Sequence, residues 1–158
     1  MIDCNKLPNI TDLVPHDAPM ILVDNIIAVD ETTIHCQVFI SAECQFFDPQ
    51  SRAINSYVGI EYMAQSVSAW SGYRSYLKNE PSPIGFLLGT RRYDTESDLF
   101  YEGDILDVYA EKLMESEGMG AFSCSIKCKN KLLAIAQLNV FVPNKEQLEV
   151  MLKGKEND

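Results

Sequence analysis

One long segment is predicted to be a single helix in a chain whose other regular segments are typical of strands. From Ser56 to Lys78, large apolar residues recur at spacings of three and four, as they do along an α-helix. These positions are Ile60, Met63, Ala64, Val67, Trp70 and either Tyr73 or Leu77. Asn55 or Ser56 suits the N-cap, and the prolines of NEPSP end the helix. A helix that is apolar on most of its circumference needs burial on most sides, which predicts a sheet wrapped round it.

Strand-like segments lie on both sides of this helix. PMILVDNIIAVD and TTIHCQVFI precede it, and the second has an apolar face with a period of two. IGFLLGTRRYDT, GDILDVYAEKLMES, GAFSCSIKCKN and KLLAIAQLNVFVP follow it. KNK, from Lys129 to Lys131, suits a tight hairpin turn between the last two, whereas residues 41–55 have no clean period and predict a loop. This order predicts an α+β fold in which a curved antiparallel sheet of about six strands surrounds one helix.

The bulk properties narrow the possible partners. A chain of 158 residues suits one domain, predicted over residues 1–143, followed by a short tail at 144–158 that is helical or frayed. The formal net charge of −10 disfavours nucleic acid and anionic membranes as partners. No apolar run approaches the ~20 residues of a membrane span, and the start lacks the pattern of a signal peptide. The expected compartment is therefore the cytoplasm.

The five cysteines do not indicate a metal site or a disulfide framework. Their number is odd and they are scattered along the chain. Cys124 and Cys128 are four residues apart, but they lie in a strand-like segment without a second Cys or His pair nearby. Reduced thiols that fill core space are the better interpretation, and no metal is expected.

Glu61 is an ionisable residue in the first turn of the apolar helix. Gln65, Ser68 and Gly72 follow it on one stripe at spacings of four, three and four, so Gln65 can hydrogen-bond Glu61 from the next turn. A carboxyl group that loses water holds its proton more tightly and can act as a general acid. The alternative is that Glu61 reaches solvent, where an acidic residue in the first turn also suits the helix dipole.

Several motifs resemble a known enzyme family. LVPHDAPMILVDNI followed by GIEYMAQ resembles the β-hydroxyacyl-acyl-carrier-protein dehydratases of the hot-dog fold, and FYEGDIL at residues 100–106 resembles that family's step into the next strand. GIEYMAQ, GFLLGTRRY and LNVFVP together are similar to the branch found in aryl polyene pigment clusters. The resemblance extends, with gaps, over roughly residues 7–142.

The resemblance implies a reaction and roles for particular residues. A 3-hydroxyacyl thioester on a phosphopantetheine arm loses water and becomes the trans-2-enoyl thioester. Glu61 matches the family's acid and Gln65 the glutamine that follows it. Backbone N–H groups near Ser56 and Tyr57 would hold the negative charge on the thioester oxygen. The expected partners are an acyl carrier protein and a second hot-dog subunit, in a homodimer or a heterodimer, and no cofactor is needed.

The family's basic histidine has no counterpart in the expected place. CQFFDPQSRAINSYVG, where the family has its G-H-F-P loop, contains no histidine. His16 of PHDAP could serve as the base if the fold brings it to the helix N-terminus. His35, within a strand, and Asp48, in the loop, are lesser candidates. Alternatively, the chain is one half of a mixed dimer whose partner supplies the histidine.

Further residues are candidates for binding the substrate or its carrier. Arg91 or Arg92 could meet a phosphate or an acidic carrier helix, or the pair could simply offset nearby acidic residues. Phe47 and Phe86 could line an acyl channel, although aromatic residues are more often plain core. Other candidates for such a channel are Phe46, Tyr57 and Trp70.

Two other functions remain compatible with the sequence. An acyl thioesterase on the same fold would use Glu61 to orient water and would release free thiol from acyl-CoA. A non-catalytic partner would stabilise another dehydratase, and its Glu61 would be dispensable. Fold alone does not decide between these functions.

Overall fold

The computed structural model describes residues 7–13, 21–80 and 85–156, apart from the side chains of residues 86, 145 and 154–156. Three helices are described, namely α1 (Ile10–Leu13), α2 (Val58–Leu77) and α3 (Lys145–Glu156). The strands are β1 (Asn25–Val29), β2 (Thr33–Phe39), β3 (Phe47–Asp48), β4 (Ala53–Asn55), β5 (Phe86–Thr95), β6 (Leu99–Tyr101), β7 (Ile105–Ser116), β8 (Met119–Cys128) and β9 (Lys131–Phe141). The predicted helix at 56–78 is thus confirmed to within two residues at its start.

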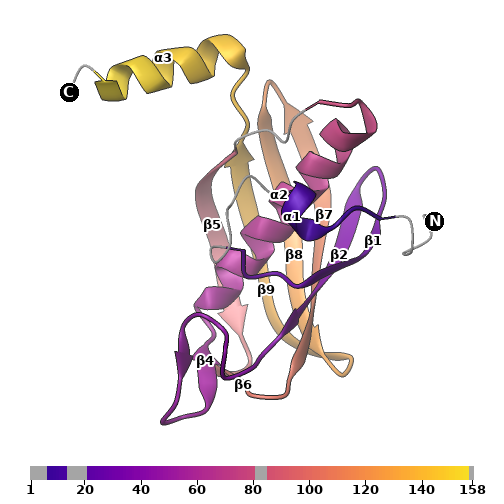
Figure 1. Cartoon of the computed structure of the whole chain (residues 1–158), viewed down its shortest axis with the longest axis vertical. Helices are drawn as coiled ribbons and strands as arrows, with labels where there is room; N and C mark the ends of the chain where they lie inside the picture. Colours follow the sequence, from indigo (N-terminus) through magenta and orange to yellow (C-terminus); the bar gives the residue numbers. More distant parts are fainter. Residues whose placement is uncertain (1–6, 14–20, 81–84, 157–158) are drawn as a thin grey trace.

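A six-stranded antiparallel sheet forms the main layer, in the order β1-β2-β7-β8-β9-β5. The sheet curves round α2, which lies along its concave face, and α1 packs against α2 (Figure 1). The alternation read from the sequence decides which face is buried: Ile34, Cys36 and Val38 of β2 are buried, and the residues between them are more exposed. The predicted α+β arrangement is therefore confirmed.

The hairpin between β8 and β9 has the predicted turn. Lys129 and Asn130 connect the two strands, and both have positive φ, at 52° and 66°. Two successive residues with positive φ define the turn that matches the twist of a tight hairpin. The predicted KNK turn is confirmed.

Residues 41–55, predicted to be a loop, contain two very short strands. β3 and β4 pair with each other, and β4 also pairs with β6, which gives a separate three-stranded sheet. Strands of two or three residues are too short to show a period of two, so the sequence pattern could not reveal them. This small sheet leads directly into the N-terminus of α2 and fixes where that helix begins.

The far part of α2 shows how the helix is covered. Tyr73 is buried, whereas Leu77 is 63% exposed, so Tyr73 is the residue that continues the apolar face. At Gly72 the helix meets α1 so closely that an added Cβ would lie 1.9 Å from the Leu13 carbonyl oxygen. Glycine is therefore required there by the contact between the two helices.

The last helix extends away from the sheet (Figure 1). Three of its apolar residues, Val150, Met151 and Leu152, are exposed. The predicted division at residue 143 falls in the connection between β9 and α3, and the division into a domain and a tail stays a prediction. Among the described residues, no helix has the length and apolar character needed to cross a membrane.

Candidate functional site

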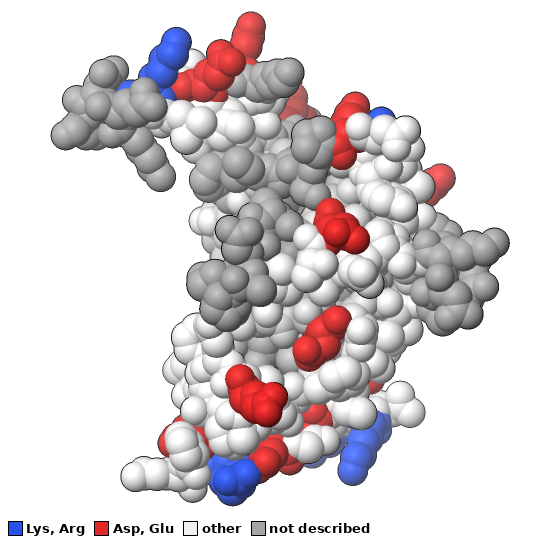
Figure 2. Space-filling view, viewed as in Figure 1, with Lys and Arg blue, Asp and Glu red and all other residues white. Residues whose placement is uncertain are grey.

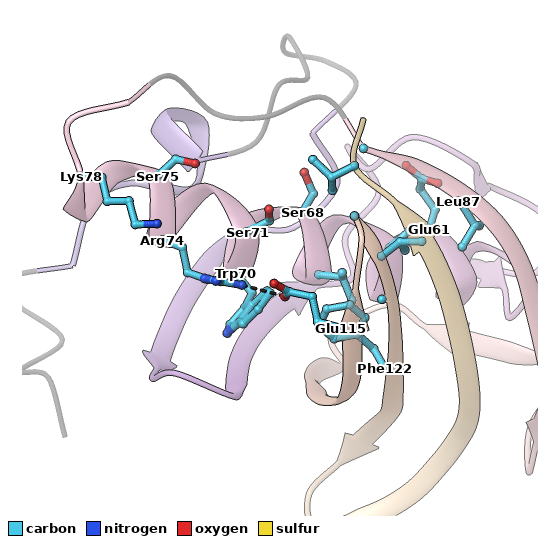
Figure 3. A pocket seen from close by; sticks show the side chains of 17 residues that line it. Glu61, Ser68, Trp70, Ser71, Arg74, Ser75, Lys78, Leu87, Glu115 and Phe122 are labelled. Carbon is cyan, nitrogen blue, oxygen red and sulfur yellow. Dashed lines mark hydrogen bonds and ion pairs between the residues drawn. The ribbon is translucent and has the colours of Figure 1, made fainter. Parts of the chain in front are cut away.

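A groove of about 490 Å³ runs along one flank of α2 (Figure 3). One wall is the helix, and the other is formed by β5, the β7–β8 hairpin and the end of β9. The helix contributes Glu61, Ala64, Val67, Ser68, Trp70, Ser71, Arg74 and Ser75, with Lys78 just after it. The facing wall contains Gly85, Leu87, Glu115, Gly118, Gly120, Phe122, Val140 and Val142. The volume lies within the range of small-molecule sites in proteins.

Glu61 is half-buried and lines one end of this groove. The Gln65 side-chain amide donates a hydrogen bond of 3.2 Å to the Glu61 Oε1 atom, as the spacing of four residues predicts. Gln65 itself is 1% exposed, and its Oε1 atom accepts a hydrogen bond of 2.8 Å from the Leu22 N–H. Because the carbonyl side of the amide is engaged by a donor, the NH₂ side must face Glu61. Gln65 thereby fixes the orientation of the carboxyl group.

The N-terminus of α2 has its first amides already engaged within the chain. The Ser56 N–H donates to the Asp98 carbonyl oxygen at 2.9 Å, and the Tyr57 N–H donates to Asn55 Oδ1 at 2.9 Å. Ser56 is buried and Tyr57 is 74% exposed. Among the described residues, the Val58 N–H has no hydrogen-bond acceptor. The role predicted for the Ser56 and Tyr57 amides stays a prediction, and Val58 joins them as a candidate that sequence reasoning did not name.

A tyrosine from the neighbouring strand holds the start of α2. The Tyr93 hydroxyl donates to the Ser56 carbonyl oxygen, and burial raises the pKa of Tyr93 to about 12. A Cβ added at Gly59 would lie 2.1 Å from that hydroxyl oxygen. Glycine at this position is therefore what lets β5 approach the first turn of α2.

An ion pair lines the groove farther along α2. Arg74 donates to Glu115 at 2.7 Å, and its guanidinium lies 4.9 Å from the centre of the Trp70 ring. Lys112 lies on the same ring at 5.3 Å. The sequence analysis did not identify this stretch of the groove. The available signal was the continuation of the Glu61 stripe by polar residues at spacings of three and four, namely Ser68, Ser71, Ser75 and Lys78.

His35 does not line the described groove. His16 lies outside the described residues, and its predicted role as base stays a prediction. His35 is half-buried in β2 and pairs with Asp107 at 2.7 Å, and its ring stacks on Tyr109 at 4.3 Å. Since Ile34 and Cys36 are buried against the helix side, His35 points to the opposite face of the sheet.

Trp70 lines the groove, whereas Arg91, Arg92 and Phe47 are not among its described lining residues. Arg91 and Arg92 are both exposed, and Arg92 has a φ of 51° within an irregular stretch of β5. That irregularity interrupts the alternation of faces that a regular strand would give the pair. Phe47 packs against the core. The Arg52 guanidinium lies over it, 5.7 Å from the centre of the Phe47 ring. The side chain of Phe86 lies outside the described residues.

Asp48 takes part in a turn, and two of the cysteines, Cys36 and Cys124, are buried in the core. The Asp48 carboxylate accepts hydrogen bonds from the Gln50 N–H and the Ser51 hydroxyl, as in a turn. Burial raises the pKa of the Cys36 and Cys124 thiols to about 12, which favours the uncharged core thiols that the sequence predicts. In the described part of the chain, no three His, Cys, Asp or Glu side chains are grouped so as to hold a metal ion.

Negative charge dominates the visible surface. Figure 2 shows acidic side chains spread over this face, whereas lysine and arginine lie toward its two ends. The formal net charge is −10. An acidic partner therefore meets repulsion over most of this face.

Comparisons with known proteins agree with this architecture. The sequence profile of the ApeP-like family, described as ApeP dehydratase, matches residues 8–153. A chain of the dehydratase heterocomplex ApeI:P from Xenorhabdus doucetiae is 30% identical, with a TM-score of 0.86 over 93% of this chain and 99% of that chain. No curated protein sequence matches.

More distant structures share the fold at low identity. A hypothetical thioesterase with coenzyme A from Streptococcus pneumoniae has a TM-score of 0.59 at 9% identity, over 76% of this chain and 85% of its own. The PaaI protein of the phenylacetic acid degradation operon of E. coli has a TM-score of 0.58 at 13% identity, over 73% and 80%. These two likenesses concern the fold alone.

Proposed function

The chain belongs to the ApeP-like dehydratase family, the hot-dog-fold dehydratases of aryl polyene biosynthesis, and from this premise we propose a substrate and a role for each site residue. The substrate is a 3-hydroxyacyl thioester carried by an acyl carrier protein, and the product is the trans-2-enoyl thioester. Glu61 is the acid. The observation that carries the proposal is the position of Glu61, half-buried at one end of the groove and oriented by Gln65. The cytoplasm stays the compartment predicted from the sequence.

The reaction divides between an acid and a base. The base removes the proton from carbon 2 of the acyl chain, and the hydroxyl on carbon 3 leaves with a proton from Glu61 as water. The electrons of the broken C–H bond form the new double bond. As Glu61 gives up its proton, the hydrogen bond from Gln65 strengthens, because its acceptor becomes charged. The Val58 N–H, which has no acceptor among the described residues, would stabilise the charge that develops on the thioester oxygen, and the Ser56 and Tyr57 amides could contribute only by exchanging their present acceptors.

The base is proposed to come either from His16 or from a second hot-dog subunit. One observation favours a shared site: the relative at 30% identity is part of a heterocomplex. A partner subunit would also offer a docking surface for the acidic carrier protein, which the charge of this chain repels.

The test is an assay of 3-hydroxyacyl-carrier-protein dehydration by the chain alone and by its complex with a second hot-dog subunit. Glu61→Gln is expected to lower kcat of the active form about 10²- to 10⁴-fold, because the variant cannot donate the proton. Full turnover by Glu61→Gln would show that the chain is a non-catalytic partner.

The same assay distinguishes a self-sufficient dehydratase, a shared site and a thioesterase. Activity of the chain alone that disappears in His16→Ala identifies a self-sufficient enzyme with His16 as base. Activity that appears only in the mixture, and that survives His16→Ala, identifies a shared site. Release of free thiol from acyl-CoA without an enoyl product would identify a thioesterase instead.

A further inference from the structure

We propose that Tyr93 is a positioning residue for the reaction: its hydroxyl group fixes the first turn of α2 and, with it, the Val58 N–H and the Glu61 carboxyl group. This inference rests on the proposed function, because it takes Glu61 as the acid. Tyr93 acts through the backbone, since its hydroxyl donates to the Ser56 carbonyl oxygen and the residue is not among the described lining of the groove.

A β-bulge in β5 precedes this contact. Arg92 and Tyr93 together lie opposite the single residue Ala136 of β9, and Arg92 has a φ of 51°. This left-handed conformation is uncommon for residues other than glycine. A bulge bends its strand and changes the direction of a side chain, and bulges are over-represented beside active sites. Tyr93 accordingly packs against the core, whereas Arg92 is exposed.

The Tyr93 hydroxyl holds one peptide group at the start of α2. The Ser56 carbonyl oxygen accepts from this hydroxyl and also from the Gly59 N–H, at 3.0 Å. The N–H of the same peptide group belongs to Tyr57 and donates to Asn55 Oδ1 at 2.9 Å. Because a peptide group is planar, hydrogen bonds on both of its sides fix its orientation.

The reacting groups follow directly from this peptide group. The Val58 N–H belongs to the next peptide group and has no acceptor among the described residues, so its direction depends on the peptide before it. The Ile60 N–H donates to the Tyr57 carbonyl oxygen at 3.2 Å, which continues the tight turn as far as Glu61. Misplacement of a reacting group by about 1 Å can cost on the order of 10²-fold in rate. A hydroxyl that holds this turn therefore affects catalysis without touching the substrate.

Gly59 permits the contact and provides a second way to test it. A Cβ at this position would collide with the Tyr93 hydroxyl oxygen, whereas the ring carbon that bears the hydroxyl would lie 3.2 Å away. The other close atom is the Ile126 Cδ1 at 3.0 Å, the end of a flexible side chain. Gly59→Ala therefore forces Tyr93 away from the turn, and Tyr93→Phe makes room for most of the added methyl group.

The test measures kcat, KM and Tm for Tyr93→Phe, Gly59→Ala and the double variant, in the form of the protein that shows dehydratase activity. The substrate is a 3-hydroxydecanoyl thioester of acyl carrier protein. Tyr109→Phe is the matched control, because it also removes one hydroxyl from a strand. Tyr109 stacks on His35, on the face of the sheet away from α2.

Tyr93→Phe is expected to lower kcat about tenfold and to change KM less than twofold, because the lining of the groove is intact. Gly59→Ala should lower both kcat and Tm. The double variant should recover the Tm of Tyr93→Phe but keep its low kcat, since the collision is relieved while the hydroxyl is still missing. Tyr109→Phe should keep the kcat of the unmodified protein.

Amide hydrogen exchange gives a readout that is independent of turnover. In Tyr93→Phe, exchange at the Gly59 and Ile60 amides should accelerate at least fivefold more than exchange at the Val67 amide, two turns farther along α2. Equal acceleration at all three amides would show a general loss of stability and would overturn the inference.

The kinetic outcomes that contradict the inference differ from those that contradict the proposed function. Tyr93 would only stabilise the fold if Tyr93→Phe kept kcat within twofold, or if the double variant regained kcat together with Tm. Failure of Tyr93→Phe to fold would likewise show that the hydroxyl serves the fold itself, which overturns the inference. The proposed function fails separately, through full dehydration by Glu61→Gln.

Discussion

Gln65 connects the stability of the fold to the chemistry of the site, and Gln65→Met separates the two contributions. Methionine has nearly the same length and shape as glutamine but can neither accept from the Leu22 N–H nor donate to Glu61. The substitution therefore removes hydrogen bonds of 2.8 Å and 3.2 Å at a residue that is 1% exposed. One loss acts on folding, and the other acts on the orientation and charge of the acid.

The magnitude of each loss follows from its surroundings. An unpaired buried donor costs about 1–3 kcal/mol, and the half-buried Leu22 places this loss at about 1–2 kcal/mol. For a chain of 158 residues, that lowers Tm by about 2–8 °C. The hydrogen bond that Gln65 donates to Glu61 strengthens by about 1–2 kcal/mol when the carboxyl group loses its proton. Because Gln65→Met removes this stabilisation, kcat should fall roughly five- to thirtyfold.

The assay measures Tm and the dehydration kinetics of the active complex. Ser66→Ala is the matched control, because Ser66 is also buried in α2 and hydrogen-bonds the Tyr62 carbonyl oxygen at 2.8 Å, but it does not contact Glu61. The control should lose stability and keep its kcat. If Gln65→Met lost stability but kept kcat within twofold, Gln65 would be a structural residue and the proposed positioning of Glu61 would be wrong.

Three further predictions concern packing and pH. Gly59→Ala should reduce the free energy of unfolding by about 1–3 kcal/mol in urea titrations, because its Cβ would lie 2.1 Å from the Tyr93 hydroxyl oxygen. Gly72→Ala should destabilise at least as much, despite the better helix propensity of alanine, since the Leu13 backbone cannot move aside as a side chain can; an unchanged urea midpoint would contradict the close contact. Burial raises the pKa of Cys124 to about 12, so the native state keeps a proton that the unfolded state loses above about pH 9, and stability should fall as pH rises through this window. Urea titrations at pH 8 and pH 10.5 should show a smaller fall for Cys124→Ala than for the unmodified chain.

Much of the fold is encoded in local periodicity. The three- and four-residue spacing of apolar residues predicted α2, and two-residue alternation predicted β2 with its buried face. Helix geometry also predicted that Gln65, one turn beyond Glu61, can hydrogen-bond it, and the structure contains this hydrogen bond. Such features depend on residues close in sequence, so the spacing alone is sufficient to predict them.

The sequence was less informative where contacts join distant segments. β4 has three residues and exists because β6, more than forty residues later, pairs with it. Short strands of this kind gain their hydrogen bonds only after the chain has closed a long loop, and no local pattern reports that closure. The predicted loop at 41–55 missed β3 and β4 for this reason.

The sequence by itself determined the helix, the alternating strands and the acid with its neighbouring glutamine. Only the tertiary structure decided that a groove follows this helix, that Glu115 meets Arg74 beside it and that His35 faces the other side of the sheet. Periodicity records which face of an element is buried, but not which other element covers it. A binding site is formed between elements, and it therefore depends on how they pack.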